Sequence, residues 1–174
     1  MNSQLVEIYL DAENDVKNNN YTEAFKKYES ILFDEPGNAA THNSLGWIHK
    51  TQMDNYAKAE NHYLAAIKSE PNYPYAYINY ATLLMDQERY SDLEKLIQKA
   101  LEIATTDKAM LYHRLGLANE MQLKFDDAVS FYEKSILFSL SDEKIKNYQA
   151  DIERVEEKKK IAKKYSNWLG RIKV

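Results

Sequence analysis

A pattern that recurs every 34 or 35 residues constrains the fold of this 174-residue chain more than any other feature. Four segments can be aligned under one another, spanning residues 5–38, 39–73, 74–108 and 109–141. The first half of each carries one small residue at the same place: Ala12, Gly46, Ala81 and Gly116. Because a unit of this length cannot bury its apolar face alone, tandem copies predict stacked units that share one core.

The second half of each segment has an aromatic residue three positions before a small or apolar one. The pairs are Tyr21 and Ala24, Tyr56 and Ala59, Tyr90 and Leu93, and Phe125 and Ala128, and the larger residues Tyr28, Tyr63, Ile97 and Tyr132 follow four positions later. Small residues let two helix axes approach, and large residues fill the space beside them. Each segment is therefore expected to form two antiparallel helices.

The scarcity of helix-breaking residues supports a mostly helical chain. There are four glycines, all isolated, and three prolines, so phosphate-cradling glycine loops are not expected. Pro36 and Pro71 close the first two segments, where they would stop a helix. Pro74 suits the first turn of a new helix.

The clearest segments are SLGWIHKTQMDNYAKAENHYLAAIKSEP, residues 44–71, and RLGLANEMQLKFDDAVSFYEKSI, residues 114–136. They resemble the tetratricopeptide repeat, whose pattern is Leu-Gly, an aromatic residue three before Ala, a second aromatic and Ala, and then Pro. The resemblance implies an all-α fold, a right-handed α-α superhelix of four helix pairs. It assigns residues 1–140 to a solenoid and residues 141–174 to a C-terminal region.

That C-terminal region is predicted to begin with one long helix, from Ser141 to about Lys164. Ser141 is a suitable N-cap, and the acidic residues after it favour the helix dipole. An apolar stripe with steps of three and four runs through Ile145, Tyr148, Ile152 and Val155. This stripe predicts a capping helix packed on the last repeat.

The end of the chain is basic and apolar together. Residues 153–174 contain eight Lys or Arg and three Asp or Glu, whereas the rest of the chain contains 15 and 24. Four apolar residues stand on this background: Tyr165, Trp168, Leu169 and Ile172. For the basic residues we expect a solvated helix end or a tail resting on the acidic solenoid, with an acidic partner, membrane lipid or nucleic acid as the alternatives. The apolar residues indicate that the tail folds back onto the protein or docks on a second copy or a partner.

No pattern in the chain indicates catalysis or a cofactor. Cysteines are absent, and neither HExxH nor GxSxG occurs. His42 and His49 are seven residues apart on one predicted helix, which separates them by roughly 10 Å and argues against a shared metal. We expect these histidines to replace aromatic residues where helices pack. The prediction is no catalytic, cofactor or metal site, and no enzyme.

Charge and hydropathy narrow the classes of partner. The chain has 23 basic and 27 acidic residues, so no nucleic-acid partner is expected. No apolar run is long enough for a transmembrane helix, and no signal peptide is recognisable at the start. A cytoplasmic location is the resulting expectation.

The resemblance also implies a concave groove lined by the first helix of each pair. Alignment to the repeat gives the lining residues Tyr9, Glu13, Asn43, Trp47, Tyr75, Ile78, Thr82, His113 and Leu117, with Lys50, Met85 and Glu120 one turn further along. The basic residues with which some members of the family clamp a carboxylate are missing here. The lining looks aromatic and apolar, which suits an apolar or amphipathic segment, with Trp47 as the best anchor. An equally weighted alternative is that Trp47, Tyr75 and Ile78 pack between repeats.

The sequence therefore predicts a non-catalytic protein–protein interaction module, an adaptor or scaffold that binds a partner's peptide or helix in the groove. One alternative is self-association, as a dimer or an autoinhibited monomer, through a tail that enters a groove. Another is a regulatory subunit that the basic tail recruits to an assembly.

Overall fold

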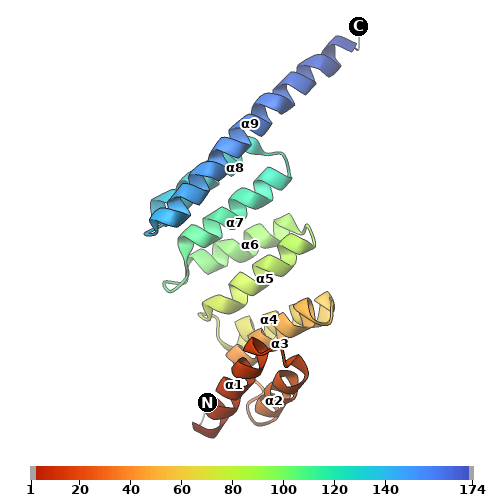
Figure 1. The fold of residues 1–174 in the computed structure, drawn as a ribbon, viewed down its shortest axis with the longest axis vertical. Coiled ribbons are helices and arrows are strands. Elements are labelled where there is room, and N and C mark those ends of the chain that lie inside the picture. Colours follow the sequence, from red (N-terminus) through yellow and green to blue (C-terminus); the bar gives the residue numbers. More distant parts are fainter. Residues whose placement is uncertain (1–2, 173–174) are drawn as a thin grey trace. The chain divides into compact units, whose positions relative to one another are not determined.

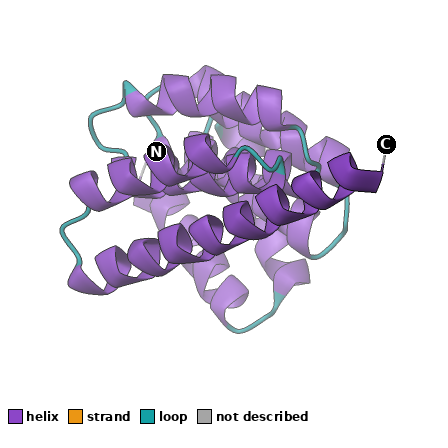
Figure 2. Cartoon of the chain, turned by 90° about the horizontal axis from the view of Figure 1, so that it is seen from above, coloured by secondary structure: helices purple, strands orange, loops and turns teal. Residues whose placement is uncertain are grey.

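The computed structural model describes the backbone of residues 3–172 and the side-chain surroundings of residues 3–165. Within these residues the chain forms helices and connecting turns, with no strand (Figure 2). The helices, labelled in Figure 1, are α1 Ser3–Lys17, α2 Tyr21–Asp34, α3 Ala39–Thr51, α4 Tyr56–Ser69, α5 Pro74–Asp86, α6 Tyr90–Leu101, α7 Lys108–Met121, α8 Phe125–Phe138 and α9 Asp142–Ile172. Helices α1 and α2, α3 and α4, and α7 and α8 pack together as predicted pairs, and α5 and α6 lie in the third predicted segment.

The starts of several helices follow from local sequence. The side chains of Asn38 and Asp107 accept hydrogen bonds from backbone N–H groups three residues ahead, at 2.9 and 3.0 Å. They satisfy donors that the first turn of a helix leaves free. Pro74 occupies the first turn of α5, as predicted, where its missing N–H has no cost.

The turns inside the helix pairs share a backbone feature. Each contains one residue with positive φ, and these residues are Asn19, Asp54, Glu88 and Leu123. Their spacing reproduces the sequence repeat. No glycine has been placed at these sites, although the left-handed conformation favours it.

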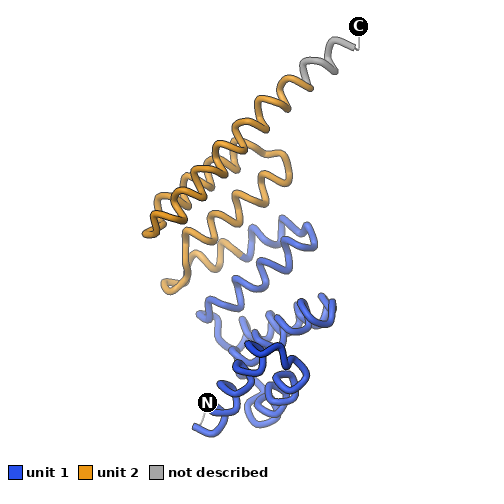
Figure 3. The backbone as a smooth tube through the Cα atoms, in the orientation of Figure 1, with its two compact units in different colours: residues 1–96 blue, residues 97–174 orange. Residues whose placement is uncertain are grey.

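The chain divides into two compact units, residues 1–96 and residues 97–174 (Figure 3). The core of the first unit contains Tyr28, Ile31, Leu45 and Ile48, all fully or almost fully buried. A smaller cluster of Ala39, Ala66 and Ala76 brings α3, α4 and α5 together. Small residues therefore lie where the helices of this unit approach most closely.

In the second unit, α9 packs against α8 and completes the core. Val155 is fully buried with Ala128 and Tyr132, and Ile152 packs against this cluster. Tyr148 is also buried, so the predicted stripe faces the protein. Ser141 accepts a long hydrogen bond of 3.4 Å from the backbone N–H of Lys144.

The predicted end of this helix near Lys164 was wrong, because α9 continues to Ile172. Residues 156–165 are mostly Glu, Lys, Ala and Ile, without Pro or Gly, and nothing in them stops a helix. A separate C-terminal region beginning at residue 141 stays a prediction.

Candidate functional site

Several of the predicted lining residues meet on one face of the first unit, formed by α1, α3 and α5. We call it the first-helix face. It contains a pocket of about 210 Å³, whose lining is Glu13, Val16, Tyr28, Asn43, Ser44, Trp47 and Asn79. Three of these residues, Glu13, Asn43 and Trp47, belong to the lining that the alignment predicts. The first-helix face is therefore the candidate site.

A hydrogen-bond network fixes Glu13 in this pocket. Tyr28 donates its phenolic proton to Glu13 Oε1 at 2.5 Å, and Ser44 donates to the same oxygen at 2.9 Å. Tyr9 in turn lies 3.2 Å from the Ser44 hydroxyl, to which it donates. The other oxygen, Glu13 Oε2, takes part in neither of these two bonds and can accept from a ligand.

Burial governs the protonation of the two tyrosines in the network. It raises the pKa of Tyr28 well above its usual range, and the hydrogen bond to Glu13 adds to the effect. Burial also raises the pKa of Tyr9. Both phenols therefore stay neutral donors at physiological pH, and the carboxylate carries the negative charge of the pocket.

Two asparagines from neighbouring helices form the second polar element. Asn79 on α5 donates to the side-chain oxygen of Asn43 on α3 at 2.9 Å. This bond leaves both N–H donors of Asn43 and the side-chain oxygen of Asn79 available, together with one N–H of Asn79. These donors and this acceptor match the C=O and N–H of a peptide backbone.

Trp47 supplies the apolar wall, and it is half-buried. Its ring centroid lies 6.0 Å from that of Tyr21, and the indole also packs against the core of the first unit. It thus both supports the fold and lines the pocket. The pocket is more polar than the aromatic and apolar lining expected from the sequence.

The other predicted residues of the first unit have different environments. Tyr75 is 60% exposed beside Tyr73. Ile78 and Thr82 are half-buried on α5, where the Thr82 hydroxyl donates to the Ile78 carbonyl at 3.0 Å. Lys50 forms an ion pair with Asp86 at 2.5 Å and Met85 is half-buried.

The two lining residues predicted from the fourth segment belong to the second unit and contact α9. His113 lies 2.8 Å from Asp151, with its ring 4.8 Å from that of Tyr148. Leu117 packs into the cluster around Val155. The long helix therefore covers the part of α7 that the repeat pattern assigns to a groove.

The predicted tail interface is described only in part. Tyr165 is 61% exposed, and Ile161, one turn earlier in α9, is 54% exposed. The side chains of Trp168, Leu169 and Ile172 lie outside the described residues.

Sequence reasoning did not select Ser44 or Asn79 for the site. Each lies next to a selected residue, Asn43 or Ile78, and their contacts depend on how neighbouring helices are rotated. His62 was also not selected, although its ring lies 5.2 Å from those of both His42 and His49. No group of three or more side chains suited to holding a metal occurs among the described residues.

Comparison with known proteins identifies the repeat. Residues 74–136 match the family model of the tetratricopeptide repeat. This part of the chain therefore contains tetratricopeptide repeats. This family is a repeat module of protein–protein interaction, and its members are generally non-catalytic.

Individual tetratricopeptide-repeat proteins share the fold of this chain. The type IV pilus assembly protein PilF of Pseudomonas aeruginosa is 23% identical over 119 residues, which are 68% of this chain and 47% of PilF. The match thus spans about half the length of that relative. The PilF structure aligns with a TM-score of 0.77 and 20% identity, covering 96% of this chain and 75% of the other.

A crystal structure of MamA aligns with a TM-score of 0.72 and 19% identity over 97% of this chain and 90% of MamA. MamA from Desulfovibrio magneticus aligns with a TM-score of 0.66 and 14% identity, over 90% of this chain and 96% of the other. These likenesses confirm the predicted fold class, an all-α solenoid of the α-α superhelix type. Among the described residues, no helix is long and apolar enough to cross a bilayer.

Proposed function

We propose that this protein is a non-catalytic adaptor or scaffold that binds an amphipathic segment of a partner protein on the first-helix face. The observation that carries the proposal is the pocket of about 210 Å³, in which the open oxygen of Glu13 and the Asn43–Asn79 pair lie beside Trp47. Polar groups that orient a ligand next to an apolar wall are typical of recognition sites.

The chemistry of the pocket defines the segment that fits. An apolar side chain would pack against Trp47 and Val16, while the asparagine amides would bond the peptide backbone. A Lys or Arg side chain would donate to Glu13 Oε2. Residues 1–96 contain 15 acidic and 8 basic residues, so the charge of the whole unit also favours a basic amphipathic segment.

PilF is described as a type IV pilus assembly protein, which makes components of a filament-assembly machine one class of partner to look for. The shared repeat supports a scaffold role in such an assembly.

A paired pull-down from host lysate tests the proposal. The intact chain is compared with a Trp47→Ala/Ile78→Ala double variant and with Glu13→Gln, each checked for helicity by circular dichroism. Leu64→Ala, at a half-exposed site on α4 outside the pocket, is the matched control. A protein captured by the intact chain and the control but lost with both site variants supports the proposal. Equal capture by all four proteins contradicts it.

A second candidate is self-association through the basic end of α9. It is supported by the exposure of Ile161 and Tyr165 on a basic helix end and by the acidic charge of residues 1–96. Light scattering on the full chain and on a chain ending at Lys164 tests it. A dimer that becomes a monomer on truncation supports this candidate, and a monomer in both cases contradicts it.

A further inference from the structure

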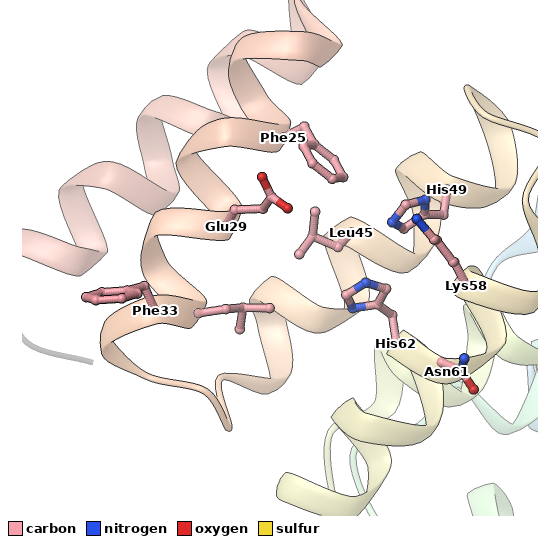
Figure 4. Close-up of a pocket in the computed structure, with 9 residues that line it drawn as sticks. Phe25, Glu29, Phe33, Leu45, His49, Lys58, Asn61 and His62 are labelled. Atoms are coloured by element: carbon pink, nitrogen blue, oxygen red, sulfur yellow. The ribbon is translucent and has the colours of Figure 1, made fainter.

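A second hollow in the first unit lies between α2 and α4, away from the residues of the first-helix face. Its volume is about 550 Å³, within the roughly 300–1,000 Å³ typical of ligand sites. Phe25 of α2 lies on one side with Leu45 of α3, and His49, Lys58 and His62 lie on the other (Figure 4). Leu32 of α2 also lines the hollow. We call this hollow the histidine pocket.

Hydrogen bonds determine which nitrogen of His62 is available. His42 Nε2 lies 2.9 Å from the carbonyl oxygen of Pro36, which can only accept, so His42 carries its proton there. In the neutral ring, His42 Nδ1 then accepts from His62 Nδ1–H, at 3.0 Å. His62 Nε2 is therefore left with a lone pair and without a partner among the described residues.

One ring nitrogen of His49 is buried without a hydrogen bond to any described residue. The residue is only 4% exposed, between the His62 ring stacked at 5.2 Å and the edge-on ring of Phe25 at 5.5 Å. Its buried Nδ1 has no hydrogen-bond partner among the described residues. A buried polar atom of this kind costs folding free energy.

A lysine beside the rings is available to an anionic ligand. Lys58 on α4 forms no ion pair with the described residues, and Glu29, an exposed residue of α2, is the one carboxylate of the pocket lining. Burial lowers the pKa of His49, and it lowers that of His62 to about 4, with His42, His49 and Lys58 adding to the effect on His62. The rings are thus neutral near pH 7 and can take up a proton when a negative charge arrives.

We propose that the histidine pocket is a second binding site, which takes a segment of a partner protein with a carboxylate directly beside an aromatic or branched aliphatic side chain. The apolar side chain would enter between Phe25, Leu32 and Leu45. The carboxylate would accept hydrogen bonds from Lys58 and from an imidazole protonated from solvent. This site differs from the first-helix face in both position and the charge it selects.

Three capped dipeptides test the proposal on the full-length chain: acetyl-Phe-Glu-amide, acetyl-Phe-Gln-amide and acetyl-Phe-Lys-amide. Binding is followed through the imidazole NMR signals of His49 and His62. The Glu peptide is expected to shift these signals and to bind roughly five- to tenfold more tightly than the Gln peptide, because its hydrogen bonds are charge-assisted. Its affinity should rise between about pH 7.5 and about pH 5.5, since binding takes up a proton.

Two variants test whether the preference for the Glu peptide depends on the histidine pocket. Lys58→Gln should abolish the preference for Glu over Gln, whereas Lys68→Gln, an exposed lysine of the same helix outside the lining, should keep it. Because His49 and His62 do not line the first-helix face, their NMR signals report on the histidine pocket and not on that face. Equal affinity for the three peptides, or no shift of the imidazole signals, overturns the proposal. Tighter binding of octanoate than of the Glu peptide also overturns it, because the site would then be one for a fatty acid.

Discussion

Gly46 on α3 lies so close to the ring of Tyr63 on α4 that a Cβ atom at this glycine would fall 2.6 Å from Tyr63 Cε1. Gly116 and Tyr132 repeat the relationship in the second unit, at 2.5 Å. Neither glycine has a positive φ, so backbone conformation does not require it. Only glycine fits at these two positions, because a tyrosine ring fills the space that any larger side chain would need.

Replacing either glycine with alanine should therefore destabilise the protein. Overpacking typically costs about 1–3 kcal/mol, which exceeds the gain of up to about 1 kcal/mol in helix propensity. Urea unfolding followed by circular dichroism measures the change. Gly37→Ala is the control, since its Cβ would meet Ser69 Oγ at an ordinary 3.4 Å. A Gly46→Ala protein as stable as the parent would contradict the packing argument.

Much of the helical framework could be predicted from the sequence, because repeated small and large residues report on helix packing directly. The starts of α3 at Ala39 and of α5 at Pro74 coincide with the predicted segment boundaries. The length of α9 could not be predicted from the apolar stripe, which weakens after Val155. Residues 156–164 continue the helix because they are mostly good helix formers, although no large apolar residue follows Val155 until Ile161.

The sites were harder to predict, because their contacts join different helices. The separation expected between His42 and His49 was calculated for two residues of one helix and includes no residue of a neighbouring helix. His62, 20 residues after His42, comes from α4 and lies 5.2 Å from each ring. Likewise, Asn43 and Asn79 meet across 36 residues. Sequence spacing fixes positions along one helix, whereas these contacts depend on the rotation of its neighbour.

The turn between α7 and α8 offers a test of backbone strain. Leu123 has a φ of 61° and is 71% exposed, so its side chain gains little from packing. Leu123→Gly should raise the free energy of unfolding by about 1 kcal/mol, because glycine adopts this conformation without steric cost. Leu140→Gly is the control, a fully exposed leucine outside the helices without positive φ. Thermal unfolding should show a higher midpoint for the first variant alone, and an equal or lower midpoint would argue against strain at Leu123.

Two buried tyrosines at equivalent repeat positions should respond differently to loss of their hydroxyl groups. Tyr63 OH is buried with no hydrogen-bond partner among the described residues, whereas Tyr132 OH donates to Glu120 at 2.7 Å. Tyr63→Phe should leave stability unchanged or raise it slightly, since an unsatisfied polar atom is removed. Tyr132→Phe should lower it by about 1–3 kcal/mol. Chemical denaturation of the two variants in parallel provides the comparison, and similar losses in both would be the contrary result.

Glu120 links α7 to the long C-terminal helix. Its side chain is 6% exposed, and it accepts hydrogen bonds from Arg154 at 2.6 and 2.9 Å and from Lys158 at 2.7 Å. Arg154, with Lys158 and Tyr132, holds the pKa of Glu120 at about 2 despite its burial. A carboxylate in an unfolded chain titrates near 4.3, so the unfolded state takes up this proton first as the pH falls.

The stability contributed by the Glu120 charge should accordingly be complete above about pH 5 and disappear between about pH 4.5 and pH 2. Glu120→Gln should lower the free energy of unfolding at pH 7 by about 1.5–3 kcal/mol, because charged hydrogen bonds from Arg154 are lost. The variant should also lose less stability than the parent on acidification through that window. Glu157→Gln is the matched control, since Glu157 pairs only with exposed Lys160 in the described residues and should leave stability almost unchanged. Urea midpoints across the pH range measure both effects, and hydrogen exchange of α9 locates them. Parallel pH profiles for parent and Glu120→Gln would show that this ion pair does not hold α9 in place.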